Sequence, residues 1–296
     1  MGFRLPDDSV RTSNFFNGVS FMGNPRPVEN DAFETLKNLN CNAITLMPYA
    51  YGQKNDAKLE FENLTWQWWG ESAEGTEESI VMAHEEGFQV MIKPQIWLDR
   101  GSFTGHHAYQ SEDEWRSFEE SYRAYIMIYA RMSEKHKLPV FCIGTELCEF
   151  VRQRPKFWQS LIADVKAVYS GKLTYAANWD TYTECWFWKD LDFIGVDAYF
   201  PLSEEKTPTV DELVVGWTPY VFEMQQFSRK INRPVVFTEW GYRSIDYCAR
   251  RPWESGRSED INLNGQLNAY QAMYIALYSQ PWFSGGFMWK WHPEHE

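Results

Sequence analysis

The sequence PVFCIGTEL at residues 139–147 is followed by FWQSLIADVKAVY at residues 157–169 and by KLTYAANW at residues 172–179. The first and third segments are short runs of apolar, β-branched and aromatic residues, whereas the middle segment repeats apolar residues at the helical period. A strand, a helix and a second strand in this order predict a unit in which the two strands run parallel and the helix crosses between them.

The same alternation extends over the rest of the chain. Six further strands are predicted at residues 15–23, 42–50, 88–97, 192–200, 234–241 and 284–291. Helices are predicted at residues 30–40, 77–87, 113–136, 210–231 and 266–279, with a shorter and weaker one at 181–191. Eight such strands predict a closed (β/α)8 barrel of the TIM type, formed as a single domain over residues 1–296. Since the sequence ends soon after the eighth strand, the last helix of the barrel is expected to be missing from the chain.

Acidic residues outnumber basic residues by 41 to 28, which gives a formal net charge of −13. This balance argues against binding to nucleic acid, to anionic membrane surfaces and to polyanionic substrates. No apolar run approaches the roughly 18 residues of a membrane-spanning helix. Residues 1–8 lack the apolar segment of a signal peptide. A soluble protein is therefore expected, either cytoplasmic or secreted with its signal removed from this sequence.

The five cysteines are odd in number and form no CxxC pair, so free thiols are expected rather than disulfides or a zinc site. The predicted first strand has no histidine, and no HExxH motif is present, which argues against a metal-dependent hydrolase. A glycine-rich phosphate loop and a GxSxG nucleophile motif are also absent from the sequence. The sequence therefore predicts neither a metal nor a cofactor.

The chain contains 15 Trp, 16 Tyr and 20 Phe. Part of this aromatic content must form the core. The remainder, beside many carboxylates, suits a carbohydrate site in which flat rings stack on sugar faces. Trp66, Trp68 and Trp69, after the second strand, are open to two interpretations: they line such a site or they cap the barrel. Packing is favoured for two of the three.

Two glutamates follow apolar strands at corresponding places in the predicted barrel. Glu146 ends the fourth strand and Glu239 ends the seventh, and the active sites of such barrels lie at these strand ends. An ion pair with a buried cation such as Lys93 would explain either glutamate alone. Two together favour glycosidic bond cleavage, in which one carboxyl protonates the leaving oxygen and the other attacks or activates water. The separation that distinguishes retention from inversion is not contained in the sequence.

Other polar residues are predicted near the same strand ends. The alternation within the third strand places Lys93, Gln95 and Trp97 toward the barrel interior, where Trp97 either stacks on a sugar or packs in the core. Asp197, on the sixth strand, either joins Lys93 in a buried network or serves as a second-choice catalytic carboxylate. His106 and His107 are candidates for hydrogen bonds to substrate hydroxyls.

Several segments together resemble a known group of enzymes. They are IKPQIW with the downstream GSFTGHH, then CIGTEL, DFIGVDAYFPL, PVVFTEWGYRS and GGFMWKW, in this order and spacing. They resemble clan A of the retaining glycosidases and, within it, glycoside hydrolase family 113, the β-mannanases. The resemblance extends from about Phe16 to Pro293.

The resemblance implies a retaining endo-β-1,4-mannanase that acts on β-linked oligo- or polysaccharides without a cofactor. Glu146 matches the general acid/base and Glu239 matches the nucleophile. Many clan members have Asn before the acid/base, where this chain has Thr145, so the usual contact with the sugar 2-hydroxyl is placed in doubt. The residues predicted to bind substrate, from the resemblance and from the strand-end analysis together, are Tyr199, Trp289, Asn178, Trp97, Gln95 and His107. Among them, Tyr199 resembles the tyrosine that hydrogen-bonds the nucleophile. Trp289 resembles the tryptophan that lies under the sugar and is often followed by a cis peptide bond. Asn178 could take over part of the 2-hydroxyl contact.

Three alternatives remain at this point. The same chemistry would serve a β-mannosidase or an enzyme that cleaves β-glucan, because loops decide the glycan. A non-catalytic carbohydrate-binding barrel would keep the aromatic residues, but it would be expected to lack one of the two glutamates. A metal-dependent hydrolase would require ligands that the sequence does not present.

Overall fold

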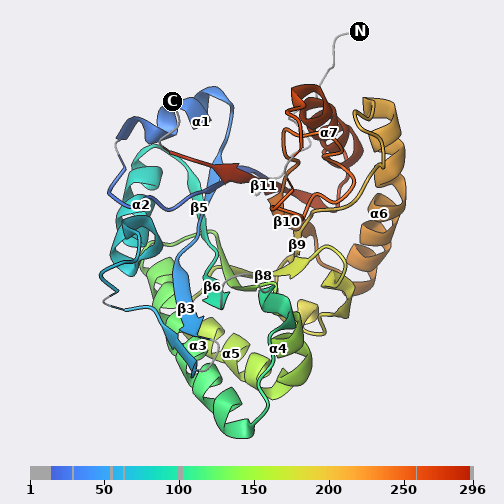
Figure 1. Ribbon diagram of the computed structural model, residues 1–296. Helices are drawn as coiled ribbons and strands as arrows, with labels where there is room; N and C mark the ends of the chain where they lie inside the picture. Colours follow the sequence, from blue (N-terminus) through green and yellow to red (C-terminus); the bar gives the residue numbers. More distant parts are fainter. Residues whose placement is uncertain are drawn as a thin grey trace.

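The computed structural model describes residues 15–28, 30–53, 56–62, 64–98, 103–257 and 259–293. A closed parallel barrel forms its centre, in which neighbouring strands follow chain order and β1 pairs with β11 to close the ring (Figure 1). The predicted (β/α)8 barrel is confirmed. Its strands are β1 (Phe16–Phe21), β2 (Ala43–Leu46), β5 (Gln89–Ile92), β7 (Val140–Thr145), β8 (Lys172–Asn178), β9 (Ile194–Asp197), β10 (Val235–Trp240) and β11 (Phe283–Trp291).

The helices surround the strands (Figure 1). Capping boxes begin the two longest helices: Ser111 with Glu114 at α3, and Thr209 with Glu212 at α6. No helix among the described residues is long and apolar enough to cross a membrane, and the described chain continues after β11 only to Pro293. The helices are α1 (Glu34–Asn38), α2 (Ala73–Glu85), α3 (Glu112–Lys135), α4 (Cys148–Gln153), α5 (Pro155–Val168), α6 (Val210–Ile231) and α7 (Leu263–Leu277), with 3-10 turns η2 (Asn30–Phe33), η3 (Trp69–Glu71), η4 (Thr104–His106), η5 (Tyr182–Glu184) and η6 (Trp188–Asp190).

The second and third predicted strands were each expected to be continuous, and this prediction is wrong. Each divides at a proline, Pro48 or Pro94, which has no N–H to donate to the strand ladder. After these prolines the chain leaves the barrel and forms a second, three-stranded sheet in the order β4-β3-β6. This small sheet consists of β3 (Tyr49–Gln53), β4 (Asp56–Glu60) and β6 (Gln95–Leu98).

The weak helix predicted at residues 181–191 is also wrong. The structure has the separate turns η5 and η6 there. Tyr182, Phe187 and Trp188 are all buried, and the Trp188 indole N–H donates to the Tyr182 carbonyl over 2.7 Å. In a single helix these three positions would point to different sides, and only one face could be buried. Two short turns bury all three side chains.

Two apolar layers support the strand ends. The barrel interior is filled by side chains that alternate strands direct inward. Between the strands and the helices lies a larger layer rich in aromatic residues. Apolar side chains fill the barrel interior, so the polar groups at the carboxyl ends of the strands lie above this layer and face the cavity. The inward layer contains Phe16, Ala43, Met91, Val140, Cys142, Ala176, Phe193, Val236 and Phe287.

Candidate active site

A cavity of about 1010 Å³ opens at the carboxyl ends of the barrel strands. Its size matches the upper range of small-molecule sites in proteins. Glu146, which directly follows β7, and Glu239, the next-to-last residue of β10, both line it. Aromatic and polar side chains from β8, β11 and the neighbouring loops complete the wall, among them Asn178, Trp179, Tyr199 and Trp289.

Glu239 is held from both of its oxygens. The Lys93 ammonium donates to Oε1, and the Gln95 side-chain amide lies 3.4 Å from the same oxygen. The Tyr199 hydroxyl donates to Oε2 over 2.6 Å. A carboxylate that accepts bonds at both oxygens, one of them from a cation, is fixed in orientation.

Lys93 joins Glu239 to a second carboxylate below the cavity floor. Its ammonium lies 3.5 Å from Asp197 Oδ1, which also accepts a 2.7 Å bond from the Thr238 hydroxyl. All of these side chains are buried. Burial opposes the charged lysine, but the two carboxylates outweigh it and raise its pKa. Burial and the charge of Glu239 raise the pKa of Asp197 to about 7, against the lowering effect of Lys93.

Glu146 has a different environment. Burial raises the pKa of its carboxyl well above the usual value, and the negative charges of Asp197 and Glu239 raise it further. Its backbone adopts a φ of +52°, in the left-handed region, which costs a non-glycine residue about 1–3 kcal/mol. Its amide donates to the Ala176 carbonyl over 2.8 Å, so β8 holds this bend in place. The two glutamates of one cavity therefore have different surroundings: Glu239 is held by donors at both oxygens, and the pKa of Glu146 is raised.

The wall contributed by β11 presents an aromatic ring beside cations. Trp289 is half-buried, and a cis peptide bond joins it to Lys290. The ammonium groups of Lys93 and Lys290 lie 5.7 Å and 5.1 Å from the centre of its ring. Gly241 lies against this segment, since a Cβ built there would approach the Trp289 carbonyl oxygen to 2.7 Å.

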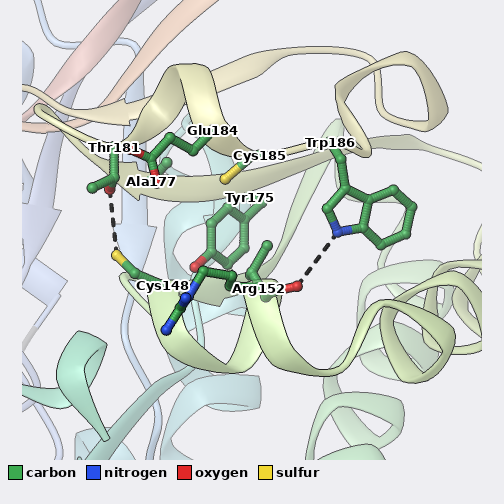
Figure 2. Close-up of a pocket in the computed structure, with 9 residues that line it drawn as sticks. Cys148, Arg152, Tyr175, Ala177, Thr181, Glu184, Cys185 and Trp186 are labelled. Carbon is green, nitrogen blue, oxygen red and sulfur yellow. Dashed lines mark hydrogen bonds between the residues drawn. The ribbon is translucent and has the colours of Figure 1, made fainter.

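The described residues contain no group of three or more His, Cys, Asp or Glu side chains that could hold a metal ion. A second, smaller pocket of about 300 Å³ lies between α4 and η5, and Figure 2 shows its lining. Cys148 Sγ and Thr181 Oγ1 lie 3.3 Å apart there, and the Trp186 indole contacts the Val151 carbonyl at 3.4 Å. This pocket has one carboxylate, Glu184, in its lining and so lacks the paired acids of the larger cavity.

The sequence of residues 26–296 matches the model of Glycoside Hydrolase Family 113. The chain belongs to this family. It is therefore a glycoside hydrolase. No significant match is found among curated proteins.

Solved structures of family 113 share the fold. The β-mannanase AaManA from Alicyclobacillus acidocaldarius, in complex with ManMIm, is 22% identical, with a TM-score of 0.80 over 96% of this chain and 89% of that one. Another family 113 β-1,4-mannanase is 23% identical, with a TM-score of 0.80 over 95% and 89% of the two chains. A β-glucuronidase from Ruminococcus gnavus is more distant, at 16% identity and a TM-score of 0.60 over 93% of this chain and 43% of that one.

Four of the residues predicted to bind substrate in this family 113 chain lie at or beside the cavity. Tyr199, Trp289 and Asn178 line the cavity, and Gln95 reaches it through Glu239. Trp97 and His107 do not line it. His107 instead packs edge-on against Tyr109, with ring centres 4.6 Å apart, whereas the neighbouring His106 lines the cavity, as does His292.

Trp97 was expected to face the barrel interior, but it is 52% exposed. The cause is the division at Pro94, after which β6 no longer belongs to the barrel. The expectation that two of Trp66, Trp68 and Trp69 are packed away is also wrong. Trp66 and Trp68 are 58% and 41% exposed.

Sequence reasoning missed several residues of the wall. Trp179 and Lys290 each follow a predicted residue, Asn178 or Trp289, so a wider window at the strand ends would have found them. Trp253 stacks on Trp179 with ring centres 5.1 Å apart, but it lies in the loop after β10, where no periodic pattern indicates its position.

Proposed function

We propose that this glycoside hydrolase is a retaining endo-β-1,4-mannanase, with Glu239 as nucleophile and Glu146 as general acid/base. The observation that carries the assignment is the contrast between the two carboxyls of one cavity. Donors at both oxygens orient the Glu239 carboxylate for attack, whereas burial and negative neighbours raise the pKa of Glu146 and favour its protonated form. This is the starting state that double displacement requires.

In the first step, Glu239 attacks the anomeric carbon while Glu146 gives its proton to the glycosidic oxygen. The bond to the leaving sugar breaks, and the departing chain carries the proton away as a hydroxyl. A covalent glycosyl ester on Glu239 remains. The hydrogen bonds from Tyr199 and Lys93 orient the attacking carboxylate before the reaction, which lowers the entropic part of the barrier.

In the second step, the roles follow from the change in charge. Esterification removes the negative charge of Glu239, which is one of the causes that raise the pKa of Glu146. The pKa of Glu146 therefore falls, and its carboxylate accepts a proton from water as the water oxygen attacks the anomeric carbon. The ester bond breaks, Glu239 returns as a carboxylate, and two inversions leave the β-configuration retained.

The proposal of mannan as substrate is supported by membership of family 113 and by the names of the similar solved structures. Within the cavity, Trp289 is proposed to lie under the reacting sugar, and Tyr199 beside it. Thr145 directs its hydroxyl to the Pro94 carbonyl at 3.3 Å. Asn178, which lines the cavity, is therefore proposed to contact the sugar 2-hydroxyl in its place.

The test uses two matched substrate series, β-1,4-manno-oligosaccharides and cello-oligosaccharides. Chromatography identifies the products, and NMR determines the anomeric configuration in which each product is first released. Internal cleavage of the manno-series with β-products is expected. Release of single terminal mannoses would point to a β-mannosidase instead, and preference for the cello-series to a β-glucan-cleaving enzyme. An α-product would contradict the covalent mechanism.

A further inference from the structure

The small sheet has two chemically different faces. β3 and β6 pair in parallel, and Figure 1 shows them side by side, extending away from the barrel. Ala50, Ile96 and Leu98 are buried on one face. The helix α3 covers this face, and its Tyr125 hydroxyl contacts the Pro48 and Gln95 carbonyls at 2.8 Å and 3.0 Å. Since strand side chains alternate, the residues between these buried ones must lie on the opposite face.

The opposite face is aromatic, and its tryptophans are exposed while its tyrosines are partly buried. Tyr51 and Trp97 are direct partners in the register of β3 and β6. The ring of Trp66 meets Tyr51 edge-on at 4.5 Å between centres, and Tyr49 stacks beside Tyr51 at 6.3 Å. Trp66 and Trp97 are both more than half exposed. We call Tyr49, Tyr51, Trp66 and Trp97 the aromatic platform. A cluster of exposed rings of this kind marks a binding surface more often than a packing surface.

The platform residues do not line the catalytic cavity, but the strand β6 links them to it. Gln95 is the register partner of Tyr49, and its side-chain amide lies 3.4 Å from Glu239 Oε1. Trp97 follows two residues later on the same face, about 7 Å farther along the strand. The platform therefore begins at the proposed nucleophile and leads away from it.

A second connection passes through Glu71. The Tyr51 hydroxyl donates to Glu71 Oε2 over 2.5 Å, and the Gln67 amide holds this segment by donating to the Tyr49 and Glu71 carbonyl oxygens. Lys290, whose ammonium lies over the Trp289 ring, is close enough that its charge lowers the pKa of Glu71, although burial raises that pKa overall. Platform and cavity wall are thus joined by polar side chains that offer donors and acceptors to hydroxyl groups.

The geometry points to the aromatic platform as a binding surface for further sugar units of a neutral β-linked polysaccharide, on the glycone side of the bond that is cleaved. The inference rests on the proposed function and extends it. The glycone side follows because the platform is reached through Glu239, which bonds to the glycone. The other aromatic pair of the cavity, Trp179 and Trp253, lies on the side of Glu146 instead. Trp179 directly follows β8, and β8 accepts the hydrogen bond from the Glu146 amide. Flat rings stack on the C–H faces of pyranoses, and a chain lying across Tyr51 and Trp97 would be held without any charge of its own.

The experiment measures binding without turnover, in the Glu239→Gln protein. Calorimetric titration gives the dissociation constants for mannobiose and mannohexaose, and their ratio reports the contribution of distal units. Trp97→Ala and Trp66→Ala are each added to this background, together with Trp97→Phe. Trp186→Ala is the matched control, because Trp186 is similarly exposed but lines the separate pocket between α4 and η5.

Trp97→Ala and Trp66→Ala are each expected to reduce the preference for mannohexaose at least tenfold, or about 1.4 kcal/mol. Trp97→Phe should restore part of the preference, and Trp186→Ala should leave it intact. A preference that survives both platform substitutions overturns the inference, while cleavage of manno-oligosaccharides by the unsubstituted enzyme would leave the proposed function standing. Failure of the Glu239→Gln protein to bind any manno-oligosaccharide would contradict both.

Discussion

Lys93 is expected to stabilise the folded enzyme through its position between two buried carboxylates. It contacts Glu239 directly and lies 3.5 Å from Asp197, and its side chain is inaccessible to solvent. Lys93→Met keeps most of the aliphatic chain but leaves both carboxylates without their cation. Removing one partner of a buried pair typically costs about 3–5 kcal/mol, because the remaining charge stays desolvated. The melting temperature should fall on the order of 10 °C.

The pH dependence of this loss has a definite sign. Asp197 has a pKa of about 7 in the presence of Lys93, and loss of the ammonium raises it further, since the lysine charge lowers it. A carboxyl with a raised folded-state pKa binds more protons when folded, so the free energy of unfolding falls as pH rises from its unfolded pKa of about 4 through the folded value. The deficit of Lys93→Met relative to wild type should therefore be smallest near about pH 5 and grow toward about pH 8.

Denaturant unfolding followed by tryptophan fluorescence at several pH values measures this deficit. Adding Asp197→Asn to Lys93→Met should recover part of the stability, because it removes one uncompensated charge. Lys137→Met, which breaks an exposed pair with Glu134, should unfold close to wild type because solvent already screens that pair. A Lys93→Met deficit below about 1 kcal/mol at neutral pH, or one that shrinks as pH rises, would refute the electrostatic reasoning.

Further predictions concern the reaction itself. Tyr199→Phe removes the 2.6 Å bond to Glu239 and should lower kcat/KM for manno-oligosaccharides roughly 10- to 100-fold in steady-state assays, since such bonds contribute about 1.5–3 kcal/mol; an unchanged kcat/KM would count against this role. The raised pKa of Glu146 should appear as the alkaline limb of the pH profile of kcat/KM, because activity falls as the acid loses its proton, and a profile without that limb would argue for another acid. Glu146→Ala should still react with an aryl β-mannoside that has a good leaving group, and azide should restore turnover as β-mannosyl azide, detectable by mass spectrometry; hydrolysis of manno-oligosaccharides at the wild-type rate would exclude Glu146. Gly241→Ala places a Cβ 2.7 Å from the Trp289 carbonyl, and a displacement of the ring by about 1 Å should lower kcat/KM on the order of 100-fold, which a parallel melting curve would separate from unfolding.

The barrel and the pair of glutamates could be predicted because they depend on local patterns. Short apolar runs alternate with amphipathic helices, and in such a barrel the carboxyl ends of the strands meet at one face. Glu146 and Glu239 directly follow two of these runs, so the topology alone places them at one mouth. The same reasoning placed Asn178 and Tyr199 at the ends of neighbouring strands.

The small sheet could not be predicted in this way. The alternation of side chains was extended through Pro94 as if the strand were continuous, which directed Trp97 toward the interior. Pro48 and Pro94 carry the information that the strands leave the barrel, but where they go depends on their pairing with each other and with β4. The position of Trp253 likewise depends on its contact with Trp179, which no local pattern contains.

The most direct test of the central claim is to trap the covalent intermediate. The fluorine of an activated 2-deoxy-2-fluoro-β-mannoside slows both the formation and the hydrolysis of the glycosyl-enzyme. A good leaving group speeds formation alone, so the glycosyl-enzyme should accumulate. Intact-mass measurement followed by peptide mapping is expected to find one added sugar, attached to Glu239, and none on the Glu239→Gln protein. A label on Glu146 or Asp197, or no label from an enzyme that cleaves the matching oligosaccharides with inversion, would contradict the account.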